Sequence, residues 1–551
     1  MGSGPRGLLI AAIVLLGIGE FAWGWHSVMA RLVATRQATA VPHRPPPLPA
    51  AKAHLFTRDE ANAFLARAKK AEAIADPLQR CLAYPDPPGS HWSPDAVAAF
   101  CRYYRLPVIT FAEAQQLIQS GHAAELDHRL AAALQAQMTE PGSKGLLDRI
   151  YREAFRNGSF DIRPTLDAWM RESPNSAFAY AASGVAYESM AGDARGGAYM
   201  ADTPQSNVDS MDKLLGQADR DLRRAIALNP QMTPAYVAMI NAGGLGLGTS
   251  YAEDAARRGL AVAPDDYAIY SILMWAKQPK WGGSIGAMRQ LADQAQAHAK
   301  ENPLLELLQS EAPYYEASNC DCDRDTELAA YPPALDQLAS TNDLAAAGHA
   351  ADGTPRVETS LIYLSEALRF EPTRDNERLH RAFDLVDFDE AAWAVAEANR
   401  LITASPRNED AFKVRGHAYE AMNDYVHAEQ DFRAALALDP HDLWTLTQLG
   451  DMFVNWTHEW DKGWAIADRM IRDQPENPYG WFLRATIQER QPRAGLKDTV
   501  DYFEAHFGSD PQMREQAVRM RAALILQTHS GSKVLAAKGQ STAGKSVAAS
   551  Q

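Results

Sequence analysis

One short motif in this 551-residue chain has the form of a catalytic site. The segment Gly282–Gly286 (GGSIG) fits the G-x-S-x-G pattern of hydrolases, in which a strand leads into a strained turn that presents the serine as a nucleophile. The residues before it, Trp275–Trp281, are instead expected to end a helix and form its turn. We therefore predict that Ser284 caps a helix, and we expect no catalytic residue.

The four cysteines form two local pairs, which could bind a metal or form disulfides. Cys320 and Cys322 stand in a C-D-C-D sequence that lacks the second ligand pair of a specific zinc site. We predict no metal and no cofactor, and both pairs are disulfide candidates. A bond between Cys81 and Cys101 would close a loop of roughly twenty residues and stabilise the fold by about 3 kcal/mol. Two buried thiols are the alternative.

Composition and charge limit the classes of partner. The formal net charge is −15, and no cluster of lysine and arginine of the kind that binds phosphates is present, which argues against nucleic acid as the main partner. The histidines form no H-E-x-x-H motif, so we interpret them as surface or satisfied groups. Alanine-rich helical windows are frequent and alternating β-branched runs are scarce, which predicts an all-α protein.

Most of the chain is organised around the stretch Asn408–Pro440. Small and aromatic residues recur there at helical spacing, which predicts two short helices packed as a hairpin. The residues of the shared face are Phe412, Gly416, Tyr419, Ala428, Phe432 and Ala435. This order, followed by Pro440, resembles the tetratricopeptide repeat, a helix–turn–helix unit of about 34 residues. Arg415 departs from the family pattern, which prefers leucine at that position.

Weaker copies of the pattern recur along the chain. Prolines that end helices form a ladder at Pro174, Pro230, Pro264, Pro303, Pro372, Pro406, Pro440, Pro475 and Pro511. Three of the intervals between them are 34 residues long, the length of one repeat. The chain is therefore predicted to form an all-α solenoid of antiparallel helix pairs from about Gly145 to Pro511.

The predicted organisation has seven parts. They are a membrane anchor or signal segment (1–30), a proline-rich linker (31–54), a helical segment with a cysteine pair (55–144), a first array (145–305), a degenerate repeat or hinge (306–340), a second array (341–511), and a final helix with a disordered tail (512–551). The first array contains an insertion, 190–216, which we expect to form a surface loop. Residues 150–319 also resemble a bacterial tetratricopeptide-like domain-of-unknown-function family, which implies no known activity.

The N-terminus is expected to be a single membrane anchor. Leu8–Trp25 is an apolar run near the lower length limit for a spanning helix, with tryptophans where an interfacial belt would lie. A cleaved signal peptide is the alternative. The cysteine pairs favour a periplasmic body at the inner membrane, against a weak charge rule that slightly favours a cytoplasmic one.

In a solenoid of this type the first helix of each pair lines a concave groove, as the resemblance implies. Repeat phase then predicts which side chains face the groove and contact a protein or peptide partner. These candidates are Asn241, Trp275, Asp410, Lys413, His417, Trp444, Thr447, Asp451 and Asn455. For the two tryptophans, packing between hairpins is the alternative interpretation.

Three functions follow as hypotheses. The first is a non-enzymatic, membrane-anchored scaffold that binds a protein or peptide in its groove. The second is a dedicated inhibitor or immunity-type binder of one envelope enzyme or toxin, which would use the insertion and the cysteine-bearing segment. The third is an enzyme centred on Ser284 or on a metal held by Cys320 and Cys322.

Overall fold

The regular elements are helices whose starts are set by side-chain caps. The computed structural model describes residues 54–198, 200–491 and 493–526, and all regular structure in them is helical. Thr57 and Glu60 form a capping box at the first of these helices. Asn408 caps the first helix of the best-preserved repeat by accepting a hydrogen bond from the backbone nitrogen of Ala411. The all-α prediction is confirmed for the described residues.

The helices follow one another along the chain in three parts. The first part contains α2 (Arg58–Glu72), α3 (Pro77–Ala83), α4 (Pro94–Tyr103), α5 (Phe111–Gln119), α6 (Ala123–Thr139), η3 (Pro141–Ser143), α7 (Leu146–Ile150), η4 (Tyr151–Phe155), η5 (Phe160–Ile162) and α8 (Arg163–Glu172). The middle contains α9 (Ala177–Arg195), η6 (Met200–Asp202), α10 (Gln205–Leu228), α11 (Thr233–Ala242), η7 (Gly243–Leu247), α12 (Thr249–Val262), α13 (Tyr267–Ala276), η8 (Pro279–Trp281), α14 (Ile285–Gln296), η9 (Pro303–Gln309), α15 (Glu311–Ser318) and α16 (Arg324–Ala334). The last part contains α17 (Thr341–Ala351), α18 (Val357–Phe370), α19 (Asp375–Asp387), α20 (Ala391–Ala404), α21 (Glu409–Ala421), α22 (Tyr425–Leu438), α23 (Leu443–Asp451), η10 (Met452–Trp456), α24 (Trp460–Asp473), α25 (Pro478–Arg490) and α26 (Leu496–Phe507), and residues 514–526 are also helical.

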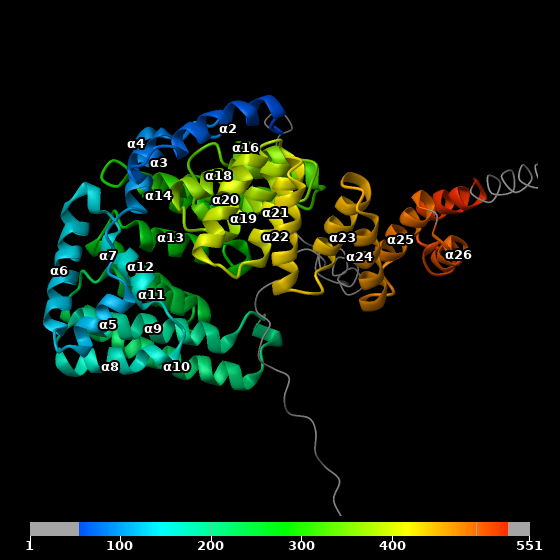
Figure 1. The fold of residues 1–551 in the computed structure, drawn as a ribbon. Coiled ribbons are helices and arrows are strands. Elements are labelled where there is room, and N and C mark those ends of the chain that lie inside the picture. Colours follow the sequence, from blue (N-terminus) through cyan, green and yellow to red (C-terminus); the bar gives the residue numbers. More distant parts are fainter. Residues whose placement is uncertain (1–53, 199, 492, 527–551) are drawn as a thin grey trace, which may run out of the picture. The chain divides into compact units, whose positions relative to one another are not determined.

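Consecutive helices pack as antiparallel pairs, and glycines set how closely the two helices of a pair approach. The pairs are α9–α10, α11–α12, α13–α14, α17–α18, α19–α20, α21–α22 and α23–α24 (Figure 1). A Cβ at Gly416 would lie 2.8 Å from the ring of Phe432, and one at Gly348 would lie 2.7 Å from Leu364. Because the same contact recurs two repeats apart, the chain has the tetratricopeptide-like architecture that the sequence predicts.

The insertion 190–216 is mostly helical, which corrects the expectation of a surface loop. Residues up to Arg195 lengthen α9, residues from Gln205 onward lengthen α10, and only the connection between them is irregular. The added turns bury an apolar cluster of their own, which includes Met211 and Leu215. Apolar residues at helical spacing in the insertion therefore extend the hairpin.

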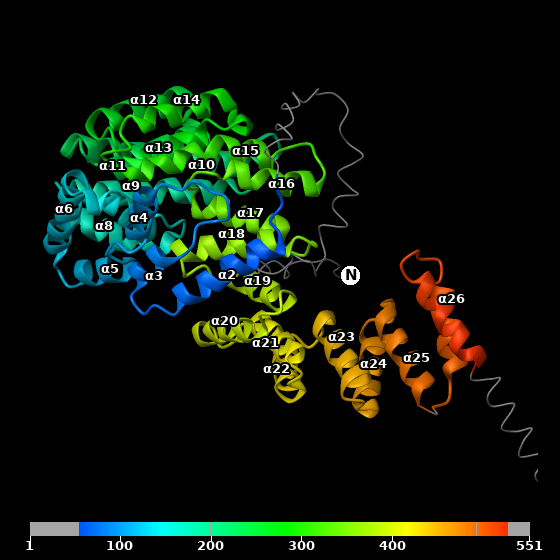
Figure 2. The same ribbon diagram turned by 90° about the horizontal axis from the view of Figure 1, so that it is seen from above.

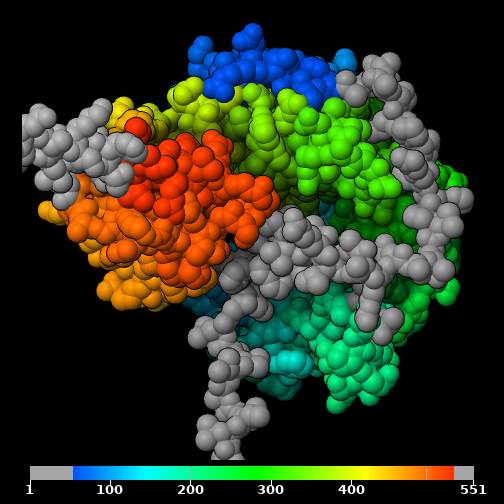
Figure 3. Space-filling model, turned by 90° about the vertical axis from the view of Figure 1, so that its right-hand side faces the viewer, coloured from blue at the N-terminus to red at the C-terminus, as the bar shows by residue number. Residues whose placement is uncertain are grey.

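The segment before the array folds back onto helices that lie about 300 residues later in the chain. Figures 1 and 2 show α2, in blue, alongside α18, and the space-filling view shows blue residues directly on the yellow-green ones (Figure 3). Arg381 of α19 donates to Glu72 of α2 at 2.8 Å, and Arg369 of α18 donates to the backbone oxygen of Cys81 at 2.9 Å. The long-range contacts hold this segment in the array.

The predicted degenerate repeat, 306–340, receives part of the same segment. The indole nitrogen of Trp92 donates to the backbone oxygen of Leu335 at 3.0 Å, and the backbone nitrogen of His91 donates to the backbone oxygen of Asp336 at 2.8 Å. Leu335 and Asp336 therefore hold the N-terminal segment, while α15 and α16 also pack against each other.

The predicted membrane anchor Leu8–Trp25, the proline-rich linker and the polar tail lie outside the described residues. Among the helices that the structure describes, none combines the length and the hydropathy needed to cross a bilayer.

Candidate functional site

A cavity of about 370 Å³ opens among the first helices of the first array. Helices α9, α11 and α13 form one side of it, while α4, η4, α15 and the start of α17 form the rest. The first helices α9, α11 and α13 therefore face one concave space, as the sequence predicts for a solenoid.

Two arginines give the cavity its cationic part. Arg152 lies in the π-helical turn η4 and Arg156 is the residue that caps this turn, so both side chains leave the backbone close together. Arg152 pairs with Glu153 at 3.2 Å, and its guanidinium carbon lies 5.6 Å from the centre of the Tyr103 ring. Arg156 also lines the cavity, and its positive charge favours the ionised form of the buried carboxyl group of Glu188.

Glu188 is the most deeply enclosed acid of the cavity, since only 3% of the residue is exposed. Burial raises the pKa of its carboxyl group to about 7, while the charge of Arg156 and a hydrogen bond from Asn241 act in the opposite direction. The side-chain nitrogen of Asn241 donates to Oε1 of Glu188. A carboxyl group with this pKa is ionised in only part of the molecules at neutral pH.

Two further acids of the cavity come from the starts of α15 and α17. Burial raises the pKa of Asp343 to about 6, although Ser340 donates a hydrogen bond of 2.7 Å to it. Burial, and then the charge of Asp343, raise the pKa of Glu311 well above its ordinary value. The cavity therefore combines two guanidinium groups with several carboxyl groups whose pKa values are raised by burial, among them that of Asp148.

Aromatic side chains supply most of the remaining surface. Tyr104 packs edge-on against Phe100, with its hydroxyl 2.8 Å from Oγ1 of Thr341, and Tyr267 packs edge-on against Tyr103. Trp275 lies 4.8 Å, centre to centre, from the exposed Trp281. Among the described residues, no histidine or cysteine lines the cavity, so its chemistry is suited to binding polar and aromatic groups.

The structure distributes the sequence-predicted binding residues over several places. Asn241 and Trp275 line the cavity. Lys413 lies within an ion cluster, 2.6 Å from Glu409 and 3.0 Å from both Asp410 and Asp442. Burial opposes the charge of Lys413, but these carboxylates raise its pKa above the ordinary value. The Lys413–Asp442 pair therefore connects adjacent repeats, while Asp410 pairs with Lys413 within α21.

His417 and Trp444 lie against each other, with ring centres 5.8 Å apart. Trp444 also meets Phe383 at 5.8 Å, so it packs between hairpins, in agreement with the alternative interpretation. Burial lowers the pKa of His417, but Asp387 and Glu420 outweigh burial and raise it to about 9. His417 is therefore a cation at neutral pH.

The last three candidates lie further along the chain. Thr447 donates to the backbone oxygen of Leu443 at 2.8 Å within its own helix. Asp451 and Asn455 line a second cavity of about 300 Å³, where Arg490 donates to Asn455 at 2.8 Å. The nine candidates thus do not form one site.

Ser284 and the four cysteines, which first suggested catalysis or metal binding, have structural roles. Ser284 is the N-cap of α14 and accepts a hydrogen bond of 3.1 Å from the backbone nitrogen of Ala287. Cys81 is bonded to Cys101, and Cys320 to Cys322. The structure therefore gives Ser284 the capping role that its sequence context predicts.

Sequence reasoning missed the charged and aromatic residues that make up most of the cavity. These are Tyr103, Tyr104, Arg152, Arg156, Glu188, Tyr267, Glu311 and Asp343. One signal could have found Glu188, since it is an acid in a helix otherwise rich in alanine, glycine and aromatic residues. A second signal is the arginine pair four residues apart in the segment YREAFR.

Comparisons with known proteins found similarity to solved structures. No protein-family model matches the chain, and no curated protein matches it either. The chain is similar to the TPR domain of P58(IPK), with 12% identity over 74% of this chain and 99% of that chain and a TM-score of 0.22. It is also similar to yeast Tom70, with 13% identity over 88% of this chain and 98% of that chain and a TM-score of 0.32.

Proposed function

We propose that the chain is a non-enzymatic scaffold that binds a segment of a partner protein in the cavity lined by α9, α11 and α13. The observation that carries the proposal is the combination of two arginines, four carboxyl groups with raised pKa values and several aromatic rings on helices that face one concave space. Enclosed aromatic and guanidinium groups are the usual anchors of protein interfaces.

The charges indicate how such a segment would lie. An anionic side chain or chain terminus of the partner would bind Arg152 and Arg156, because a guanidinium group recognises a carboxylate through two parallel hydrogen bonds. An apolar or aromatic side chain of the partner would pack on Trp275 and Tyr267. Hydrogen-bond donors of the partner next to this side chain would donate to the side-chain oxygens of Asn241 and Glu188.

Affinity capture with the full chain as bait, read out by quantitative mass spectrometry, tests the proposal. Partners that bind in the cavity are expected to be lost when Arg152→Ala and Arg156→Ala are combined. They are expected to remain with Arg257→Ala, a control on α12 whose side chain is 73% exposed. Partners retained by the double variant would contradict the proposed site.

The same experiment separates the scaffold from a dedicated inhibitor. Several partners of moderate affinity favour the scaffold. One tight partner, lost only when the tip of the α9–α10 hairpin is changed, would favour the inhibitor instead.

We further propose that the N-terminal segment anchors the chain in the inner membrane and that the body lies in the periplasm. The two cysteine pairs support this proposal, because disulfides persist in oxidising compartments. Fractionation followed by a count of free thiols under denaturing, non-reducing conditions is the test. Four reactive cysteines would indicate a cytoplasmic body.

A further inference from the structure

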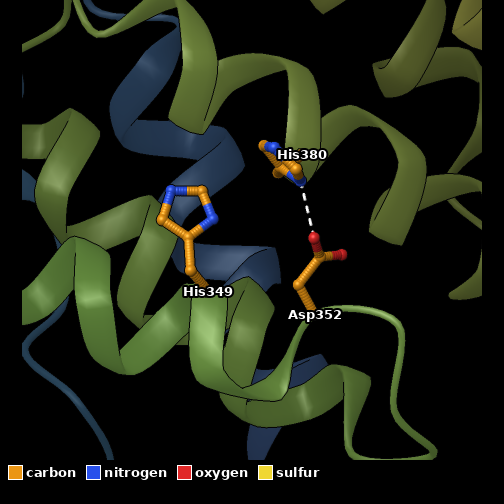
Figure 4. Close-up of side chains that lie close together, drawn as sticks. All are labelled: His349, Asp352 and His380. Atoms are coloured by element: carbon orange, nitrogen blue, oxygen red, sulfur yellow. Dashed lines mark hydrogen bonds and ion pairs between the residues drawn. The ribbon is translucent and has the colours of Figure 1, made fainter. Parts of the chain in front are cut away.

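Two histidines and an aspartate from neighbouring repeats meet at one place outside the cavity. His349 lies in the last turn of α17, Asp352 follows this helix, and His380 lies in α19. Figure 4 shows the three side chains pointing into the same space. One ligand atom of each lies within 4.8 Å of the others, and Nδ1 of His380 is 2.6 Å from the carboxylate of Asp352.

We propose that His349, Asp352 and His380 bind one divalent transition-metal ion of the zinc class. Two imidazoles and one carboxylate are a common ligand set for zinc and related metals, with nitrogen and oxygen ligands about 2.0–2.2 Å from the ion. Ligands of such an ion lie about 3.3 Å apart, so small side-chain rotations bring all three into place. The fourth position stays open for water or a partner's side chain.

The surroundings of the cluster suit a metal. Nε2 of His349 lies 3.8 Å from Oε1 of Glu377 and 3.4 Å from Nδ2 of Asn376. Glu377 therefore adds a negative charge beside the ring of His349, which favours a cation bound at the cluster. The side chains of the three ligands are 14–30% exposed, so an ion can reach them from solvent.

Charge compensation also distinguishes this cluster from another acidic group. Glu409, Asp439 and Asp442 lie equally close together, but Lys413 already pairs with two of them. Within the described part of the chain, no lysine or arginine forms an ion pair with Asp352, whose charged partner is a histidine. Of these two clusters in the described residues, the His349 cluster is therefore the better suited to bind a metal cation.

The position of the cluster gives the ion a structural effect. His349 precedes Phe383 by one repeat and His417 by two, so it occupies the groove-facing position of its helix. An ion shared by α17 and α19 would fix the spacing between the first helices of two consecutive repeats. The sequence could not indicate this site, because its two histidines lie 31 residues apart.

The test is a titration of the purified, chelator-treated full chain with Co²⁺. Wild type is expected to bind one equivalent, to show the absorption of low-coordinate cobalt, and to release cobalt when Zn²⁺ is added. His349→Phe is expected to weaken binding by about tenfold or more. Phenylalanine should be tolerated there because Phe383 occupies the equivalent position in the next repeat. His427→Ala, an exposed histidine on α22, is the matched control and should bind as wild type does.

A second variant and a second measurement keep the test decisive. Asp352→Asn removes the carboxylate charge at a turn with little change of shape, and it should also weaken binding. Zn²⁺ should raise the thermal unfolding temperature of wild type and of His427→Ala but not of the ligand variants. The proposal would be overturned if wild type did not bind cobalt stoichiometrically. It would also be overturned if His349→Phe and Asp352→Asn bound cobalt as tightly as wild type does.

Discussion

Glu188 lies in α9 among alanines and glycines, so the fold encloses its carboxyl group although the side chain faces the cavity. Arg156 and Asn241 compensate only part of the cost of burying its charge, and the pKa of the carboxyl group is therefore raised to about 7. The group keeps its proton in the folded protein over a pH range in which the unfolded chain loses it.

Glu188→Gln is expected to change how stability depends on pH. Below pH 4.5 the carboxyl group is protonated in both states, and as the pH rises to about 7 only the unfolded state releases its proton. The free energy of unfolding of wild type therefore falls across this window, by about 3 kcal/mol from this group. The glutamine variant should lack this fall and become the more stable protein above the window.

Urea unfolding at one pH below the window and one above it measures the effect. Glu515→Gln, at an exposed position, is the control and should follow wild type at both values. An equal change in the free energy of unfolding between the two pH values in wild type and in Glu188→Gln would contradict the raised pKa of Glu188.

Individual site residues could be predicted only where repeat phase is regular. Asn241 and Trp275 were found because α11 and α13 follow the pattern of first helices. Arg152 was not, since it lies in the irregular turn η4, whose geometry the pattern does not describe. Lys413 was predicted to face the groove, but neighbouring carboxylates compensate its charge, and only the packed structure reveals such partners.

At the scale of the helical elements, glycines decide how closely two helices can pack. A Cβ at Gly416 would come within 2.8 Å of two ring atoms of Phe432, a fully buried side chain. The equivalent contact at Gly184 is 2.5 Å, to Leu222. This part of the fold was predictable, because a small residue opposite a large one recurs at a fixed offset in the sequence.

Gly416→Ala is expected to lower the free energy of unfolding by about 1–3 kcal/mol, because the new methyl group overpacks the contact with Phe432. Gly216→Ala, inside α10 with its nearest neighbour at 4.0 Å, should instead stabilise by up to about 1 kcal/mol through helix propensity. Combining Gly416→Ala with Phe432→Leu should cost less than the sum of the two single changes. Strict additivity in urea unfolding would show that the two residues do not share a contact.

The disulfides differ in the length of chain that they close. Cys81 and Cys101 are 20 residues apart, while Cys320 and Cys322 are 2 apart. Replacing the first pair by serine should lower the free energy of unfolding by about 3 kcal/mol, because a long loop gains more freedom in the unfolded chain. Replacing the second pair should cost clearly less. Thermal unfolding of the two double variants compares them, and equal losses would contradict the loop-length explanation.

At the scale of the whole described chain, the segment before the array completes the candidate site. Phe100, Tyr103 and Tyr104 come from this segment and line the cavity, although the other walls belong to helices up to 240 residues later. The sequence predicted helices here but no repeat pattern. The contacts that hold these helices against the array are made by single residues whose partners lie far away in the sequence. Local periodicity does not encode such pairs.

Arg381 is the strongest of these long-range connections. It lies in α19 with 1% of its side chain exposed, 2.8 Å from Glu72 of α2 and 3.0 Å from Glu397 of α20. Arg381→Met is expected to lower the free energy of unfolding by about 3 kcal/mol, because Glu72 would lose its buried cationic partner, while Glu397 would keep Arg378. Arg58→Met removes an exposed ion pair with Asp389 between the same regions and should cost less than about 1 kcal/mol.

Hydrogen exchange distinguishes the release of the segment from general loosening. In Arg381→Met, amides of α2 should exchange faster first, followed by those of α3 and α4, while α21 and α22 keep the wild-type rate. Because α4 carries Phe100 and Tyr103 into the cavity, the variant should also lose the partners that depend on Arg152. Faster exchange confined to α19 and α20, with α2 unchanged, would show that other contacts hold the segment and that the cavity does not depend on this arginine.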